Sequence, residues 1–157
     1  MMSNKQKFKI GDIFLVPLVN EKYGVGRVLK QDKATIFIEL LRIKPVIMPN
    51  DSCNEFDFNK EEIALKTWCY DEGLRDGSWS IIGNSVMDEP IQMPNFWRKS
   101  VDGKYYIQPG SDTYRGIPEQ RVEVTVEDIK GAFPYGIGDS IAVSRLYTKV
   151  LTDYGFL

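Results

Sequence analysis

The chain has 157 residues, of which 43% are hydrophobic and 12% aromatic, and these values are typical of one soluble globular domain spanning residues 1–157. Its 20 basic and 22 acidic residues nearly balance, which argues against a strongly basic nucleic-acid-binding protein. The chain has no histidine, which excludes Ser-His-Asp and Cys-His nucleophilic sites and removes the commonest general base and metal ligand.

The first part of the chain predicts a three-stranded meander. Residues 13–18, IFLVPL, are apolar on both alternating faces, as in a buried strand, and Pro17 predicts a free edge near its end. A hairpin loop at 19–22 leads to a second strand at 23–30. Residues 34–43, ATIFIELLRI, form the third strand after a short turn.

Gly24 and Gly26 lie on the same face of the second predicted strand, opposite the face that carries Val25, Arg27 and Leu29. A phosphate-binding loop would need a third glycine and a helix that starts at the turn, and the sequence supplies neither. We therefore predict that the bare glycine face bends the sheet or admits an aromatic ring or another strand.

An acidic loop is expected between the meander and the next strand. Five carboxylates against one lysine give residues 51–62 a net charge of −4. Phe56 and Phe58 alternate with these acids. Two interpretations stay open: the rings cap the core beneath a solvated loop, or they form an aromatic contact surface for a basic partner.

The middle of the chain predicts several short strands. Residues 63–70, IALKTWCY, place Cys69 on an apolar face, where it is a small core residue; with Cys53 it makes no disulfide framework. Residues 71–77 are rich in turn formers, and residues 78–84, SWSIIGN, form another strand. A further strand is expected at residues 93–98.

The last third of the chain combines a hairpin with helices. Asp102-Gly103 predicts a hairpin turn, and at least one of Tyr105 and Tyr106 should then belong to the core. RVEVT, residues 121–125, predicts a short strand, followed by a short helix that starts after Thr125 and ends at Gly131. The apolar residues of the final helix, capped by Asp139 or Ser140 and ended by Gly155, follow helical spacing: Val143, Leu146, Tyr147, Val150, Leu151 and Tyr154.

These elements predict a mainly β (α+β) fold: a strongly bent antiparallel sheet or partial barrel with the C-terminal helix packed on it. A binding site for a partner helix is the alternative role of that helix. No apolar run approaches the roughly 20 residues that span a bilayer, and the first residues lack a secretory signal. We expect a cytoplasmic protein that does not contact membranes.

Three segments occur in order, and together they resemble the bacterial immunity protein 26 family: KFKIGDIFLVPL (7–18), KYGVGRVL (22–29) and DGSWSIIGN (76–84). The likeness covers roughly residues 7–125. The resemblance implies a protein of a polymorphic toxin system, encoded beside a secreted toxin, which protects the producing cell and its kin. The implied mechanism is stoichiometric inhibition through an interface with the toxin domain, without turnover. We accordingly expect no enzymatic activity, no metal and no cofactor.

The resemblance assigns no catalytic residues to the chain. It implies a fold-determining role for the glycines and apolar residues of its motifs: Gly11, Ile13, Phe14, Pro17, Gly24, Gly26, Trp79 and Gly83. The polar motif residues Asp12, Arg27 and Asp76 are either buried partners of other groups or contacts to the toxin, and both roles stay open.

The first functional hypothesis is therefore an immunity protein that binds the C-terminal domain of its cognate toxin. If the toxin is a nuclease, an acidic surface would mimic the phosphate backbone in its basic site. The acidic loop and the turn that follows the next strand supply the expected partner-binding residues: Asp51, Glu55, Asp57, Glu61, Glu62, Asp71, Glu72 and Asp76. The sequence does not determine the oligomeric state.

The second hypothesis is a small-barrel module that binds nucleic acid or a peptide. The opening GDIF and YGVGRVL segments resemble the first hairpin of Tudor-like barrels, and Trp68, Trp97 or Tyr105 beside basic residues could stack on bases. The balanced charge and the acidic loop count against nucleic acid as the partner.

Overall fold

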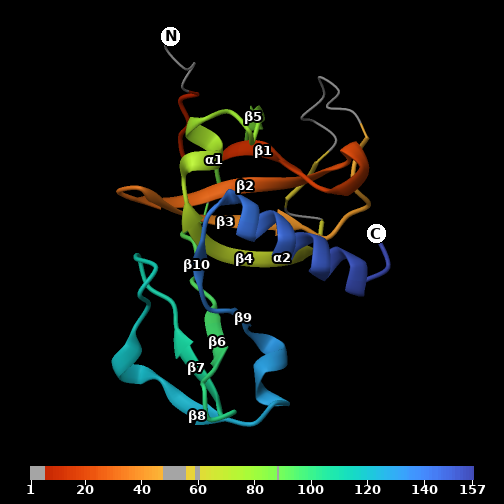
Figure 1. The fold of residues 1–157 in the computed structure, drawn as a ribbon. Coiled ribbons are helices and arrows are strands. Elements are labelled where there is room, and N and C mark those ends of the chain that lie inside the picture. Colours follow the sequence, from red (N-terminus) through yellow and green to blue (C-terminus); the bar gives the residue numbers. More distant parts are fainter. Residues whose placement is uncertain (1–5, 48–55, 59–60, 88) are drawn as a thin grey trace.

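The computed structural model describes residues 6–47, 56–58, 61–87 and 89–157. Two sheets form the fold, and Figure 1 shows the smaller one beside the larger, with the C-terminal helix lying across the larger sheet. The strand order is β10-β4-β3-β2-β1-β5 in the six-stranded main sheet and β8-β7-β6-β9 in the four-stranded second sheet.

The main sheet contains β1 (Asp12–Pro17), β2 (Tyr23–Asp32), β3 (Thr35–Leu41), β4 (Ile63–Tyr70), β5 (Ile81–Asn84) and β10 (Ile137–Gly138). The second sheet contains β6 (Asn95–Lys99), β7 (Tyr105–Pro109), β8 (Val122–Val124) and β9 (Phe133–Pro134). Among the described residues, the helices are α1 (Glu72–Arg75) and α2 (Ser140–Asp153), and short 3₁₀ turns are η1 (Val19–Glu21), η3 (Pro118–Gln120) and η4 (Asp128–Gly131).

The predicted fold class is confirmed. β1 to β4 pair antiparallel in sequence order, and bulges in the β1–β5, β2–β3 and β3–β4 ladders bend the sheet. The main sheet keeps β5 and β10 as separate edges and does not close into a barrel. Two pairings, β10 with β4 and β9 with β6, are parallel, because the C-terminal segment returns to both sheets.

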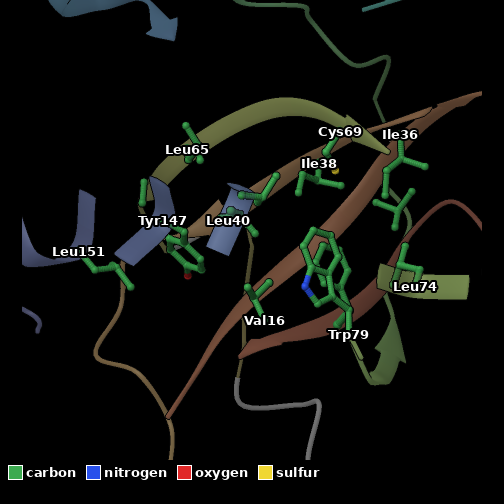
Figure 2. Packing of buried hydrophobic residues seen from close by; sticks show 14 residues of the cluster. Val16, Ile36, Ile38, Leu40, Leu65, Cys69, Leu74, Trp79, Tyr147 and Leu151 are labelled. Carbon is green, nitrogen blue, oxygen red and sulfur yellow. The ribbon is translucent and has the colours of Figure 1, made fainter. Parts of the chain in front are cut away.

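The bare glycine face admits an aromatic ring, which is one of the outcomes that the sequence predicted for it. A Cβ at Gly24 would lie 2.7 Å from Cζ of Tyr147, so only glycine leaves room for this ring from α2. The Tyr147 hydroxyl donates to the Leu41 carbonyl at 2.5 Å and accepts from the Val25 N–H at 3.3 Å. Tyr147 is fully buried and therefore fixes α2 to the main sheet (Figure 2).

The largest apolar cluster lies between the main sheet and α2, with Trp79 and Leu74 at one end and Leu151 at the other (Figure 2). Trp79 stacks on Phe14 with ring centroids 5.0 Å apart. α2 contributes Val143, Tyr147 and Leu151 to this cluster, which confirms that its apolar face packs on the sheet.

The opposite face of the main sheet carries two further clusters. Ile13, Leu15, Val25, Leu41 and Phe58 form one of them, with Phe56 packed against it. The two rings of the acidic loop therefore cap the core. The other cluster joins the two sheets through Leu29, Phe37, Trp68 and Phe96.

The second sheet contains the predicted hairpin, and Gly103 has the positive φ of +85° that the turn requires. The expectation that Tyr105 or Tyr106 belongs to the core is wrong, because both are only half-buried. Tyr105 contacts Trp97, and Tyr106 lies 5.3 Å from the Arg121 guanidinium. Tyr105 lies on the face of this small sheet opposite Phe96. Tyr106 shares the face of Phe96 but lies beside the exposed Arg121, so neither tyrosine is enclosed.

Both ends of α2 follow the sequence prediction. Asp139 caps the helix by accepting from the Ala142 N–H at 2.8 Å, and Gly155 follows its end with a φ of +83°. Tyr154 differs from the prediction, because it stays 54% exposed and lies against Arg42 instead of entering the core.

Candidate partner interface

The structure places the predicted acidic residues at the two ends of β4. Asp51 and Glu55 lie outside the described residues. The other six form a first group before β4 (Asp57, Glu61 and Glu62) and a second group after it (Asp71, Glu72 and Asp76). A strand of this length spans about 25 Å at roughly 3.3 Å per residue. β4 therefore separates the two groups along the sheet.

The first group is joined to the C-terminal end of α2. Asp57 and Glu62 are exposed, and Glu61 is half-buried. The Glu62 carboxylate forms an ion pair with Arg42, whose guanidinium lies 4.4 Å from the centroid of the Tyr154 ring. The charge of Glu62 is therefore partly balanced within the chain.

The second group divides into internal and exposed carboxylates. Asp71 is only 4% exposed and accepts from Nε of Arg75 at 2.6 Å. Glu72 accepts from the backbone N–H of Ser140 at 2.7 Å and from its hydroxyl at 2.8 Å, which joins α1 to the start of α2. Asp76 is exposed, and its carboxylate accepts from the Ser78 N–H at 2.8 Å.

A groove of about 390 Å³ opens beside this second group. The end of β1, the segment Ser78–Trp79 and the first half of α2 form its walls. Val19 and Ile141 flank the groove and are 49% and 61% exposed. Exposed aliphatic side chains gathered around one concave surface are typical of a protein-binding site.

The motif residues Asp12 and Arg27 have internal partners. Asp12 accepts from the Lys9 N–H and from the Asn84 amide, both at 2.9 Å. Arg27 forms a buried ion pair with Glu39 at 2.6 Å, directly across the β2–β3 ladder, and donates to the Ser85 carbonyl at 3.0 Å. Both residues therefore organise the fold, and Glu39 is a partner that the sequence did not single out.

The aromatic residues of the alternative hypothesis lie in different places. Trp68 is buried between the sheets, with its ring 5.4 Å from that of Phe37. Trp97 and Tyr105 lie side by side on the second sheet with ring centroids 6.1 Å apart, and Lys99 Nζ lies 5.6 Å from the Tyr105 ring. Two of the three rings thus share one surface with a basic residue.

The described residues include neither an activated thiol nor a cluster of metal ligands. Burial chiefly, and then the charges of Glu72 and Asp71, raise the pKa of the Cys69 thiol, which keeps it protonated and unreactive. Within the ranges that the structure describes, no three Cys, Asp or Glu side chains gather as metal ligands. In the same ranges, no helix is both long and apolar enough to cross a bilayer.

Comparison with known families gives one match. The family model described as Immunity protein 26 matches residues 9–107, which extend from just before β1 into β7. Neither the curated proteins nor the solved structures gave a significant match.

Proposed function

The chain belongs to the immunity protein 26 family, and on this premise we propose that it binds the C-terminal domain of its cognate toxin and neutralises it by forming a one-to-one complex. The family match over residues 9–107 is the observation that carries the proposal. Inhibition of this kind needs a stable, complementary surface and no chemical turnover. We place the complex in the cytoplasm and treat residues 1–157 as one functional unit, since an apolar cluster joins the two sheets.

The acidic residues at the ends of β4 are the proposed toxin-binding surface. Asp57 and Asp76 present exposed carboxylates, one from each group. Negative charge steers the approach of a basic partner and, in a nuclease, occupies the place of the substrate phosphates. Asp71 and Glu72 contribute to this surface by fixing α1 and α2.

The test is co-expression with the C-terminal domain of the toxin encoded beside this chain, followed by calorimetric titration of the purified proteins. We expect growth to be restored and a one-to-one complex to form with nanomolar affinity or better. A purified toxin domain that kills cells but neither binds this chain nor is inhibited by it would refute the proposal.

Charge reversal tests the contribution of each acidic group to toxin binding. Asp57→Lys and Asp76→Lys are each expected to slow association, and Glu119→Lys in exposed η3 is the matched control. If neither reversal changes the association rate at low salt, the acidic residues are not the toxin-binding surface, and formation of the complex is then explained by another surface.

Binding of single-stranded nucleic acid is the second candidate function. The adjacent rings of Trp97 and Tyr105, with Lys99 beside them, favour it, because bases stack on such surfaces. A salt-sensitive electrophoretic shift with single-stranded RNA or DNA that Trp97→Ala abolishes would support this function.

A further inference from the structure

The groove beside α2 lies where three separate parts of the chain meet. It lies between α2 and two segments, residues 17–19 at the end of β1 and residues 78–79 after α1. The buried Trp79 lines the groove, and Val19 and Ile141 stand at its rim.

Apart from Arg145, the helical wall of the groove is apolar in effect, although it carries three hydroxyl groups. Ser144 donates to the Pro17 carbonyl at 2.5 Å, and Thr148 donates to the Ser144 carbonyl at 2.7 Å. Ser140 donates to the Glu72 carboxylate at 2.8 Å. Each hydroxyl proton thus has an acceptor inside the protein, so the wall suits an apolar side chain better than a polar one.

The rim at Val19 is held in one conformation. The Leu18 N–H donates to the Lys22 carbonyl at 2.7 Å, and the Lys22 N–H donates to the Val19 carbonyl at 3.2 Å. Asn20 and Glu21 between them adopt positive φ angles of 59° and 58°. A turn closed in this way loses little conformational entropy when a partner binds.

One end of the groove carries excess negative charge. Glu72 and Asp139 lie at the start of α2, and Asp76 accepts from the N–H of Ser78 in the groove wall; within the described residues none of the three forms an ion pair with a cation. The nearby Arg75 is paired with Asp71, and Arg145 lies one turn farther along the groove wall. A positive side chain of a partner would therefore complement the end at α1.

We propose that this groove docks the toxin: an apolar side chain of the toxin domain enters between Val19 and Ile141, and a neighbouring lysine or arginine meets Asp76 and Asp139. The inference rests on the proposed function and assigns a position to the interface. It makes Ile141 the apolar contact and Asp76 the electrostatic contact.

Ile141→Asp tests the apolar contact without loss of the helix. Position 141 lies in the first turn of α2, where a carboxylate interacts favourably with the helix dipole, and the native side chain is mostly exposed. Val126→Asp is the matched control, because Val126 is 52% exposed and lies beyond β8 in the second sheet. Thermal melts of both variants should stay close to that of the wild type.

The probe is the purified C-terminal domain of the toxin encoded beside this chain, titrated with each variant. We expect Ile141→Asp to raise the Kd by about 30-fold or more, as loss of a central apolar contact does. We expect Asp76→Lys to lower the association rate about tenfold at low salt and less at high salt. Val126→Asp and Glu119→Lys should change neither quantity by more than about twofold.

The outcomes separate this inference from the function on which it rests. If the wild type binds and Ile141→Asp binds equally well, the groove is wrong and the immunity function stands. If the wild type does not bind the toxin domain, both are overturned. A wild-type dimer that Ile141→Asp converts to a monomer would assign the groove to a second copy of this chain and overturn the toxin site.

Discussion

The main sheet and the second sheet use similar interactions in different surroundings. In β1 to β4 most side chains are buried, because clusters cover both faces of the main sheet. In the four strands of the second sheet, only Phe96 and Gln108 are buried. Each region contains an ion pair, a pair of aromatic rings and glycines, so the two regions show what burial adds to each interaction.

The ion pairs show the difference most clearly. Arg27 and Glu39 expose 3% and 5% of their side chains, whereas Lys104 and Glu123 expose 55% and 57%. A buried charge that loses its partner cannot recover solvation, while an exposed one is already hydrated. Each pair joins one basic and one acidic side chain, so the difference in their contributions to stability comes from the burial that the surrounding fold imposes.

The largest expected effect comes from breaking the buried pair. Arg27→Met should lower the free energy of unfolding by about 3–5 kcal/mol, because Glu39 is left buried without its partner. Lys104→Met should cost less than about 1 kcal/mol. Urea unfolding of both variants measures the difference. The double variant Arg27→Met/Glu39→Leu should recover most of the lost stability, and equal losses in the two single variants would contradict the comparison.

The second effect concerns glycine. Gly24→Ala should destabilise the protein by about 2–3 kcal/mol, because its methyl group would overlap the Tyr147 ring. Gly131→Ala in η4 meets open space and should stay within about 0.5 kcal/mol of the wild type. In a double-mutant cycle by chemical denaturation, Gly24→Ala and Tyr147→Leu should be strongly coupled. Additive losses would show that the ring does not occupy the glycine face.

The third effect is a loss of stability at alkaline pH. Burial raises the pKa of the Cys69 thiol above its ordinary value of 9.0, so only the unfolded state releases this proton as the pH passes 9. The resulting stabilisation is complete below that pH and should fall by about 1 kcal/mol between pH 8.5 and 10. Denaturation midpoints across this range should decline less steeply for Cys69→Ala. An unchanged slope would show that the thiol titrates normally in the folded state.

The smallest effect belongs to the exposed region beside the second sheet. Hydrogen bonds from the Thr125 N–H, and then from its hydroxyl, lower the pKa of Asp128. This contribution to stability is present above the unfolded pKa and is lost as the pH falls through the folded one. An NMR titration should place Asp128 below 3.8, and Thr125→Val should move it part of the way back. If Thr125→Val leaves the titration midpoint of Asp128 unchanged, the Thr125 hydroxyl does not lower this pKa and only the backbone N–H does so.

Much of the main sheet could be predicted from local pattern. Short apolar runs and the turns between them predicted β1 to β4, and the approach of a ring was one of the outcomes predicted for the bare face of Gly24 and Gly26. The capping residue Asp139 and the terminal Gly155 of α2 followed from their residue types. Each of these features depends on a few residues that are close together in the chain, so local sequence is sufficient to predict it.

The Arg27–Glu39 pair could not be predicted in the same way. Counting back from the turn pair of Asp32 with Thr35 would place Arg27 opposite Leu40. The bulge at Leu29 shifts the register by one residue and brings Glu39 into that position instead. A single inserted residue thus decides whether a buried charge finds a partner.

The sequence by itself determined the strands β1 to β4, the C-terminal helix, the absence of histidine chemistry and the family, because local pattern, composition and short motifs carry them. The short strands β9 and β10 were not predicted. Only the tertiary structure decided that Asp57 and Asp76 stay exposed while Asp71 is buried. It also decided that Asp71 and Glu72 hold α1 and α2 and that a groove opens between α2 and β1. These features join residues far apart in the chain, and their positions depend on packing that local sequence does not encode.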